Sequence, residues 1–581
     1  MSRAGVLAFL LLFGLGCQRS TSFGARAPLQ SPVALPSRAD LDNLTRAPLP
    51  ALQDPGTVAV EQWDFEGVWQ GSTKEGEPPP APPEQVTAAI AAAGGQNAAA
   101  LHCVAEQVAR LFAKHGGLPE ERLLSYMMVR CGGVVLPGHS VSAASVEGPA
   151  EVSDDEVLAA LLPAVNRDLP GLLGGRRDLK VGSWIHREGR RAALAMIAVE
   201  APAAITVSPV DAQGRVAIRG ALAASKGETV GALINRGSHG VEPCTVVRPA
   251  PTFELACTLA PEDEQAWIEI YAQPPQHLLS SSLARALAHR RGTSAIAFPT
   301  LERSAAVADP ASFRVALLAE LNQIRTAGGL PPLTLAPVQS TSLDPVAPHI
   351  IAALRTKDEN RLDQLVLGVA AGWDVQGGVI RDANVSSSFS GHRDARGWLA
   401  NAGEQPLTRN VLFDPKADQL AVGTAFDTPL PGVSTVVATY QIYDPSELAA
   451  DTEAAFAALN RARAERGVAP AIRIPDAPEL ERAALSIPQG THPEDALQQA
   501  LEAMSRRHGR QVQGSISLTV SPKETAFPPE LLMLPAASVA IRLVHHHLPD
   551  SRWGFFIVLI AVDPSAPSQR MAAGPSERRG L

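Results

Sequence analysis

One pattern occurs twice in this chain and limits its possible folds more than any other feature. It reads Leu-Asn-x-x-Arg-x-x-x-Gly-x-x-Pro, beginning at Leu321 and again at Leu459. In the first copy the expected apolar stripe of the helix is Phe313, Leu317, Leu321 and Ile324, and the glycine and proline then end that helix. The Asn and Arg are three residues apart, so they share one helix face. Each copy therefore predicts a helix followed at once by a defined loop.

Both copies also end alike. The first closes with "DQLAVGTAFDTPLPGVSTVVATYQIYD" and the second with "ASVAIRLVHHHLPDSRWGFFIVLIAVD", and each sequence predicts a β-hairpin. The earlier segment "DLKVGSWIHREGRRAALAMIAVE" has the same layout, with a turn at Glu188 and Gly189. Two short strings also recur between the earlier segment and the middle one: Val181-Gly182 with Val422-Gly423, and Gly116–Pro119 with Gly328–Pro331. These similarities predict three versions of one domain-sized unit.

The length and composition agree with several domains. A chain of 581 residues is expected to hold about three to five domains. Between residues 202 and 276 the sequence changes to short β-rich runs separated by turns, which predicts a small β-sandwich. The formal charge of -9, without a long basic run, gives no electrostatic surface for a polyanion, so nucleic acid is not an expected partner.

The N-terminus predicts export. Arg3 precedes an apolar run from Ala4 to Gly16, which is too short to span a bilayer and suits a signal peptide. The run ends in "GLGC", which resembles a bacterial lipoprotein signal and implies that Cys17 is lipidated, although Gly14 stands where such signals usually have Leu. Gln18 is not the Asp of inner-membrane retention, so the resemblance implies an outer-membrane anchor, periplasmic or at the cell surface. The alternative is an ordinary signal peptide with an unlipidated Cys17.

Four further cysteines remain, and in an oxidising compartment an even number of thiols usually pairs. Three connectivities are open. We expect the two local ones, Cys103 with Cys131 and Cys244 with Cys257, each stabilising by roughly 3 to 4 kcal/mol through loop-closure entropy.

The copy that begins at Leu321 continues with a Trp-led stretch "GWLANAG", a turn "RNVLFDP" and a strand "LAVGTAF". With these motifs, residues 313–443 resemble the CAP superfamily, which includes cysteine-rich secretory proteins, antigen 5 and class-one pathogenesis-related proteins. The resemblance covers about a quarter of the chain, and extends in weaker form to residues 452–563 and 86–200. The matching positions are Asn322, Arg325, Gly329, Pro332, Leu333, Trp398, Asn410, Leu412, Pro415, Val422 and Gly423, and in the last copy Asn460, Arg463 and Gly467.

The resemblance implies α-β-α sandwich domains in tandem, interrupted by the β-sandwich. It also implies a structural role for the Asn and Arg, which would tie the first helix to the loop after it. The expected limits are 1–16 for the signal peptide, 17–85 for a disordered Pro/Ala-rich linker, 86–200 for a degenerate CAP-like domain, 202–290 for the β-sandwich, 300–445 for the CAP-like domain, 446–563 for a second degenerate one and 564–581 for a disordered tail.

Many CAP domains bind a divalent metal through two His and two acidic residues, but this chain departs from that set. Where the family has His after the Trp-led helix, this chain has Glu404, and the family's Gly-Glu-Asn signature is absent from the same unit. His349 and His392 are at other spacings, and we expect them on the surface or in loops. The run from His545 to His547 lies where a strand enters a turn, so we expect solvated side chains there.

Other catalytic motifs are absent from the sequence: there is no Gly-x-Ser-x-Gly, no His-Glu-x-x-His and no glycine loop with a phosphate-binding Lys. The strings at Pro137 and Gly237 place Ser beside His, and we interpret both as turns. We therefore expect no catalytic residue, no metal ligand and no cofactor. The predicted function is a non-catalytic binding or structural module of the cell envelope, with a lipid, glycan or protein ligand and a membrane attachment through Cys17. The alternatives are a metal-dependent hydrolase or peptidase with a non-standard site, and a passive envelope spacer.

Overall fold

The computed structural model describes most of the chain beyond residue 37. The described residues are 38–50, 56–58, 60, 63, 65, 83–98, 101–149, 152–174, 179–224, 227–237, 240–273, 280–290, 296–356, 358–372, 380–391, 393–519, 521–534, 537–547 and 554–563. Among them, one compact unit comprises Thr45–Asp363 with Asn384–Thr439, and a second comprises Gln364–Ala383 with the chain from Tyr440 onward and the residues before Thr45. No helix in the described part of the chain is both long and apolar enough to cross a membrane.

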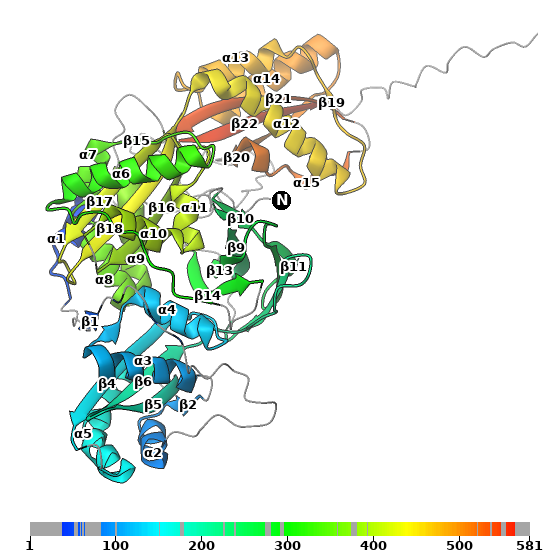
Figure 1. Cartoon of the computed structure of the whole chain (residues 1–581). Coiled ribbons are helices and arrows are strands. Elements are labelled where there is room, and N and C mark those ends of the chain that lie inside the picture. Colours follow the sequence, from blue (N-terminus) through cyan, green and yellow to red (C-terminus); the bar gives the residue numbers. More distant parts are fainter. Residues whose placement is uncertain are drawn as a thin grey trace, which may run out of the picture. The chain divides into compact units, whose positions relative to one another are not determined.

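Three four-stranded sheets share one strand order, in which a short first strand is followed by the hairpin and then by an outer strand (Figure 1). The short strand runs parallel to its neighbour in all three sheets. The first sheet comprises β2 (Gln96–Asn97), β5 (Lys180–Glu188), β6 (Arg191–Glu200) and β4 (Gly138–Glu147). The middle one comprises β15 (Thr334–Leu335), β17 (Gln419–Phe426), β18 (Val433–Ile442) and β16 (Ile380–Ser390), and the last comprises β19 (Ile472–Arg473), β21 (Ser538–His547), β22 (Gly554–Asp563) and β20 (Gln513–Thr519).

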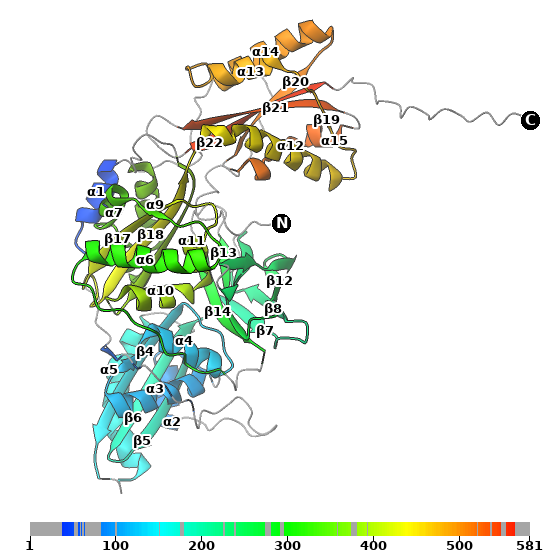
Figure 2. The same ribbon diagram turned by 45° about the horizontal axis from the view of Figure 1, so that its top comes forward.

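Helices cover both faces of each sheet, because successive strand residues face opposite sides and both sets are apolar. In the last sheet, Ile541 and Val558 pack toward α12 (Leu448–Ala464) and α15 (Pro529–Met533), whereas Ala540 and Leu559 pack toward the opposite layer. That opposite layer is α13 (Pro478–Ser486) and α14 (Pro493–His508), and the two layers are seen on either side of the sheet in Figure 2. The first sheet has α2 (Glu84–Ala92) and α5 (Asp154–Leu173) on one face, and α3 (His102–His115) and α4 (Glu121–Arg130) on the other.

The middle sheet carries α6 (Pro310–Ala327), α10 (Ala395–Gly403) and α11 (Pro406–Leu412) over one core, with Phe313 and Trp398 in edge-to-face contact. Local signals explain where α6 begins: Asp309 accepts from the backbone N–H of Ser312 at 2.9 Å, and Pro310 takes the first helical position. The remaining helices of this domain are α7 (Pro337–Leu343), α8 (Ala347–Thr356) and α9 (Glu359–Gly372).

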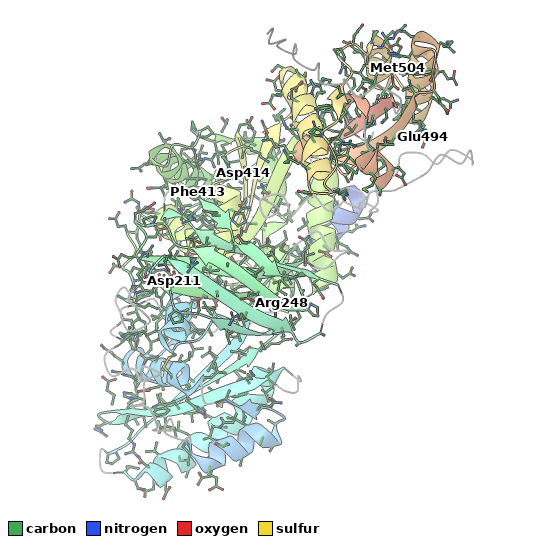
Figure 3. The ribbon with its side chains drawn as sticks, turned by 90° about the vertical axis from the view of Figure 1, so that its right-hand side faces the viewer. Asp211, Arg248, Phe413, Asp414, Glu494 and Met504 are labelled. Atoms are coloured by element: carbon green, nitrogen blue, oxygen red, sulfur yellow. A yellow bond between two sulfur atoms is a disulfide. The ribbon has the colours of Figure 1, made fainter. Side chains whose placement is uncertain are left out.

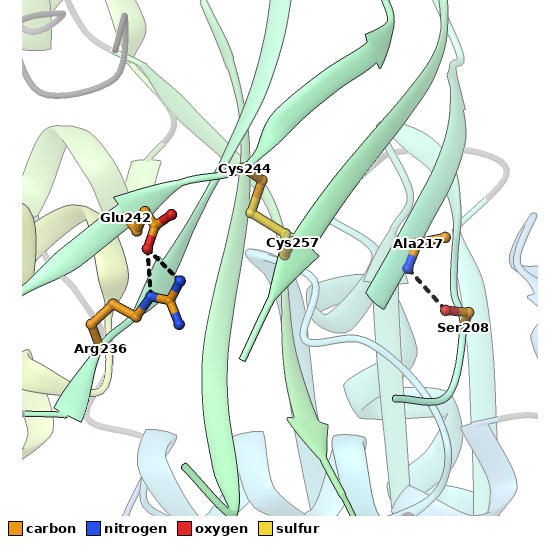
Figure 4. The surroundings of a disulfide bond; sticks show 6 residues. All are labelled: Ser208, Ala217, Arg236, Glu242, Cys244 and Cys257. Carbon is orange, nitrogen blue, oxygen red and sulfur yellow. Dashed lines mark hydrogen bonds and ion pairs between the residues drawn. A yellow bond between two sulfur atoms is a disulfide. The ribbon is translucent and has the colours of Figure 1, made fainter. Parts of the chain in front are cut away.

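The β-sandwich is built from two further four-stranded sheets around one apolar core. One contains β10 (Val241–Pro243), β9 (Thr229–Asn235), β13 (Gln265–Gln273) and β14 (Ser281–His289); the other contains β11 (Thr245–Arg248), β12 (Thr252–Thr258), β8 (Arg215–Leu222) and β7 (Ala203–Val207). The chain changes sheets at Cys244, whose disulfide to Cys257 ties β11 to β12 (Figure 4). The second disulfide joins Cys103 to Cys131, so both expected pairs form. The expected fold class, α/β with a β-sandwich, is confirmed.

Part of the predicted linker is ordered and packed. Residues Arg38–Arg46 form α1, and Thr57–Val58 form β1, which pairs with β3 (Leu118–Pro119). Phe65 is buried, and the indole N–H of Trp63 donates to the side-chain carbonyl of Gln107 at 3.1 Å. The expectation of disorder through residue 85 is therefore wrong for these segments: the side chains of Val58, Trp63 and Phe65 pack into the core beside α3, and Leu41 of α1 is buried.

The two short sequence matches have different outcomes in the structure. Gly116 ends α3, which follows the first strand, whereas Gly329 lies after α6, which precedes it. Gly94, after α2, is the residue that stands where Gly329 does. Gly182 and Gly423 differ by two residues when counted from the short strand, but both pack against the backbone of a leucine, Leu101 and Leu343 respectively, so this match holds in its contacts. Ile324 is also outside the expected stripe: it is exposed, and Arg325 is buried instead.

Candidate functional site

The repeated Asn and Arg hold the loop that follows the first helix. The Asn322 amide donates to the Leu333 carbonyl and accepts from the Leu333 N–H, both at 2.8 Å. The side chain of Arg325 has no exposed surface, and its Nε donates to the Pro331 carbonyl at 2.9 Å. Its two terminal nitrogens reach the carbonyls of Leu412 at 2.8 Å and Asp414 at 3.1 Å, which lie at and just beyond the end of α11. The guanidinium thus joins two loops that are far apart in sequence.

The last sheet repeats this arrangement with different loops. Arg463 is also fully buried, and its Nε donates to the Ala469 carbonyl at 2.9 Å. Its terminal nitrogens donate to the carbonyls of Leu531, in α15, and Leu534, each at 2.8 Å. Asn460 accepts from the N–H of Ala471 at 2.8 Å. Burial lowers the pKa of both Arg325 and Arg463.

The first domain lacks both residues because it lacks the loop. The N–H after each helix bonds to the carbonyl five residues back, at Ile90, Arg325 and Arg463 respectively. Ile90 therefore occupies the arginine position. In that domain β2 begins at Gln96, directly after the glycines, whereas β15 begins at Thr334, several residues after Gly329. With no intervening loop there are no loop carbonyls to bind, and an apolar side chain fills the position.

Glu404 stands at the corner between α10 and α11, and its carboxylate is held by the first domain. Arg122 of α4 donates through Nε to one carboxylate oxygen at 2.9 Å and through Nη2 to the other at 2.7 Å. Its Nη1 donates to the Pro299 carbonyl at 2.9 Å. Arg122 is 5% exposed and Glu404 is 19% exposed. This two-point pairing fixes both the distance and the orientation of the two side chains.

Aromatic rings surround this ion pair. The Arg122 guanidinium lies 4.6 Å from the ring centroid of Phe298 and 5.2 Å from that of Tyr126. The Tyr126 hydroxyl also donates to Glu404, at 3.2 Å. Burial, followed by the charge of Glu404, raises the pKa of Tyr126, so its hydroxyl stays protonated and serves as a donor. All the groups that contact the carboxylate are therefore donors.

The β-sandwich holds the same corner from a second direction. Asn235 of β9 donates to the Gly403 carbonyl at 3.0 Å, and the buried Glu269 of β13 accepts from the Leu407 N–H at 2.9 Å, in the first turn of α11. Arg409 of α11 donates to the carbonyl of Gly240 at 3.0 Å and also bonds that of Gly237. Burial lowers the pKa of Arg409 to about 10. We call residues 403–409, with these contacts, the α10–α11 corner.

The geometry of the α10–α11 corner favours attachment over chemistry. A carboxylate that accepts two guanidinium N–H groups and a phenol has both oxygens already engaged, so it is a poor metal ligand. The carboxylate of Asp414, labelled in Figure 3, accepts from the side-chain amide of Asn384 at 2.8 Å, and its backbone carbonyl accepts from Arg325. Within the described ranges, no three His, Cys, Asp or Glu residues lie close enough to hold a metal ion.

The hydrogen bonds of His349 go to residues other than Glu404. Its side chain is buried in α8, which corrects the expectation of a surface or loop position. Its Nε2 is 2.8 Å from the Thr45 carbonyl, and its Nδ1 is 2.9 Å from a terminal nitrogen of Arg361. A carbonyl only accepts and a guanidinium only donates, so Nε2 carries the proton and Nδ1 accepts. Burial lowers the pKa of His349, in agreement with this neutral form. His392 lies outside the described residues.

The triple histidine ends β21, as expected, but His545 is not solvated. Its ring stacks on Tyr443, with centroids 3.7 Å apart, and contacts Phe556 at 4.9 Å. Burial, and then the charge of Arg381, lowers the pKa of His545 to about 3. The ring is therefore a neutral aromatic packing group. The sequence could not indicate this, because Tyr443 precedes α12 and reaches the strand only in the folded domain.

One polar cluster, around His139, was not predicted from the sequence. His139 opens β4 rather than lying in a turn; its Nδ1 is 2.8 Å from the Leu136 carbonyl and its Nε2 is 3.1 Å from a carboxylate oxygen of Glu121. Both partners are acceptors, so both ring nitrogens carry protons. Arg285 of β14 lies 3.8 Å from Glu121 and donates to the hydroxyl of Ser125 at 3.1 Å. The only local signal was the histidine itself, since its partners come from other elements.

The remaining motif positions lie in the middle domain, except Gly467, which follows α12 in the last one. Trp398 is fully buried under α6, Asn410 is half-buried on α11 and Pro415 is exposed after it. Gly329 and Gly467 both have positive φ, at 75° and 69°, a backbone conformation that favours glycine. Cys17 and the His beside Gly237 lie outside the described residues.

No family model matches this chain, and no curated protein matches it. Among solved structures, it is similar to a cysteine-rich secretory protein from Staphylococcus aureus subsp. aureus Mu50, at 10% sequence identity. The alignment covers 41% of this chain and 85% of that protein, with a TM-score of 0.17. A TM-score this low adds nothing to the fold that the sheets themselves define.

Proposed function

We propose that this chain is an exported, lipid-anchored protein of CAP-like domains, which acts as a non-catalytic binding or structural module of the bacterial cell envelope. Its ligand would be a lipid, a glycan or another protein. Cys17 would carry the anchor, and the domains would sit at the outer membrane, in the periplasm or at the cell surface.

The main observation in support of this proposal is the ion pair that Glu404 forms. This is the acidic residue that replaces a histidine of the family's metal set, and it pairs at 2.7 and 2.9 Å with Arg122 of another domain. The second residue considered for a metal, His349, donates to a backbone carbonyl and accepts from Arg361. Both side chains bond one segment of the chain to another, which is a structural role.

Two further observations support the compartment. Cys103 and Cys131 are paired, as are Cys244 and Cys257, and such pairs persist in oxidising environments such as the periplasm. Each would stabilise its domain by roughly 3 to 4 kcal/mol in the chain-entropy model. A protein that works outside the cytoplasm would benefit from both.

Native mass spectrometry of the full chain, extracted from its own envelope in mild detergent, tests this function. The expected result is a mass that includes an acyl addition at Cys17 and a retained lipid or glycan, or a protein that co-purifies at fixed stoichiometry. A stoichiometric divalent metal, together with hydrolysis of a peptide or ester substrate that chelation abolishes, would overturn it. A bare mass without partners would leave only the spacer role and would reject ligand binding.

A further inference from the structure

Among the described residues, β11 lies at the outer edge of one sandwich sheet and pairs only with β12. All four of its residues are exposed, including Val246 at 49% and Val247 at 59%. An exposed edge with apolar side chains is a template for a further strand. Val246 is opposite the fully buried Leu255, so its side chain continues the inner, apolar layer of the sandwich beyond the last strand.

The outer face of the same sheet carries a row of alternating charge that ends at this edge. Arg219 of β8 is opposite Glu254 of β12, which is opposite Arg248 of β11. The carboxylate of Glu254 is 3.1 Å from Arg219 and 3.7 Å from Arg248. One carboxylate is thus shared between two guanidinium groups, and Arg248, labelled in Figure 3, is 63% exposed at the end of the row. A side chain that continued this alternation on a further strand, beside Arg248, would carry a negative charge.

We propose that β11 is a docking edge for an extended peptide segment in which acidic residues alternate with β-branched apolar residues. The segment adds a fifth strand to the sheet. A β-bulge between Val246 and Arg248 places their side chains on opposite faces although they are two residues apart. The acidic residue of the segment takes the position beside Arg248, and the adjacent apolar residue covers Val246 on the inner face. This inference does not depend on the proposed envelope function.

The edge is rigid before any partner arrives, which lowers the ordering cost of binding. Cys244, directly before β11, is bonded to Cys257 in β12 (Figure 4). The neighbouring strand β10 is fixed in turn by an ion pair between Arg236 and Glu242. A second copy of this chain is the poorer occupant, because pairing two β11 edges would bring another Arg248 to a row that already ends in positive charge.

Fluorescence anisotropy with a labelled synthetic peptide of alternating aspartate and valine tests the proposal on the full chain. We expect saturable binding, weakened at least tenfold by Arg248→Glu. The same variant should bind a peptide of alternating lysine and valine more tightly than the wild type does. The matched control is Arg215→Glu, an equally exposed arginine of β8 that pairs with Asp211 and lies outside the charge row. It should leave the affinity within twofold.

Backbone pairing is tested separately, by methylating alternate amide nitrogens of the peptide without changing its side chains. The N-methylated peptide should lose binding if it adds as a strand. Equal affinity of the methylated peptide, or of Arg248→Glu, for the acidic probe would overturn the proposal. So would concentration-dependent dimers in sedimentation velocity that Arg248→Glu abolishes, since these would assign the edge to a second copy of the chain.

Discussion

Arg325 and Arg463 show how a charge can be buried with backbone carbonyls as its hydrogen-bond partners. The hydrogen bonds of both guanidinium groups go to backbone carbonyls, and several of these lie at the ends of the short helices α11 and α15. The C-terminal end of a helix carries partial negative charge, so these carbonyls stabilise the guanidinium better than isolated ones would. The repeated motif is therefore explained by physical chemistry: one arginine satisfies orphan carbonyls of two loops.

Replacing Arg463 by Met keeps the length of the side chain and removes all its donors. The carbonyls of Ala469, Leu531 and Leu534 would then be buried without a partner, at about 1 to 3 kcal/mol each. We expect a loss of about 3 to 5 kcal/mol in the free energy of unfolding. Urea titration read by hydrogen exchange of peptides from Leu448 to Asp563 would measure it.

The matched control for this change is Arg466→Met, in the turn directly after the same helix but exposed, where the guanidinium donates to the nearby Ala462 carbonyl. It should change stability by no more than about 0.5 kcal/mol. Equal effects of the two variants would contradict the role assigned to Arg463.

His139 gives the domain a pH dependence with a definite sign. Burial opposes the charge of His139, but the carboxylate of Glu121 outweighs it and raises the pKa of the imidazole. Burial alone would raise the pKa of Glu121, yet His139, Arg285 and Arg355 together lower it. A raised histidine pKa means that the stabilisation is present below the ordinary histidine value and is lost as pH rises through the raised value. The lowered glutamate pKa means that its contribution is lost only in strong acid.

Comparing the wild type with His139→Gln across pH tests this linkage. The difference in thermal midpoint should be largest near pH 5.5 and should shrink by pH 9, because the neutral imidazole cannot donate to both Leu136 and Glu121. A difference that is constant over this range would mean that the histidine is not protonated in the folded protein.

Residues with local partners could be predicted from the sequence, and those with distant partners could not. The pattern with Asn322 and Arg325 predicts a loop that begins within a few residues. Glu404 and Arg122 are 282 positions apart in the sequence, so no local stretch of sequence could indicate that they pair. The burial of His545 could not be predicted for the same reason, because its stacking partner Tyr443 is also distant in sequence.

At the scale of elements, Gly423 shows how closely a strand and a helix approach. A Cβ at this position would lie 2.4 Å from the Cβ of Leu343 and 2.5 Å from its carbonyl carbon, at the end of α7. Backbone atoms cannot move aside as a side-chain tip can, so Gly423→Ala should destabilise by about 3 kcal/mol or more. Thermal unfolding of the variant, with hydrogen exchange over α7 and β17, would show the loss.

Gly171 is the control for that substitution. It lies within α5, and a Cβ there would meet no atom within 4 Å. Alanine is the better helix former by about 1 kcal/mol, so Gly171→Ala should be neutral or stabilising. A destabilised Gly171→Ala variant, or an unchanged Gly423→Ala variant, would contradict the packing described.

The hairpins, the sandwich and the two helices of the repeated motif could be predicted from periodicity, because each is defined by its own residues. Helix α2 was not predicted: the expected linker ends at residue 85, inside this helix, and its alanine-rich sequence adjoins a proline-rich segment. The sequence match at Gly116 therefore belongs to α3 and not to the helix that precedes the first strand. Helix α5 runs through Pro163 and Pro170 to Leu173, since its apolar face is held by α2 and the sheet.

For the whole molecule, the α10–α11 corner is the point where the middle domain meets two other parts of the same unit. Arg122 comes from the first domain, and Asn235 and Glu269 come from the β-sandwich. The corner thus turns separate domains of the first unit into one body. Glu404, at the position of a potential metal ligand, thus serves to attach the domains to each other.

A double-mutant cycle on Arg122 and Glu404 tests that claim most directly. The free energy of unfolding would be measured for the wild type, Arg122→Met, Glu404→Gln and the double variant, with hydrogen exchange of α4 and α10 as the readout. We predict a coupling of about 2 to 4 kcal/mol, because each single change leaves the other group desolvated and unpaired. Effects that add within about 0.5 kcal/mol would show that Glu404 does not fasten the domains, and would return it to the list of candidate functional carboxylates.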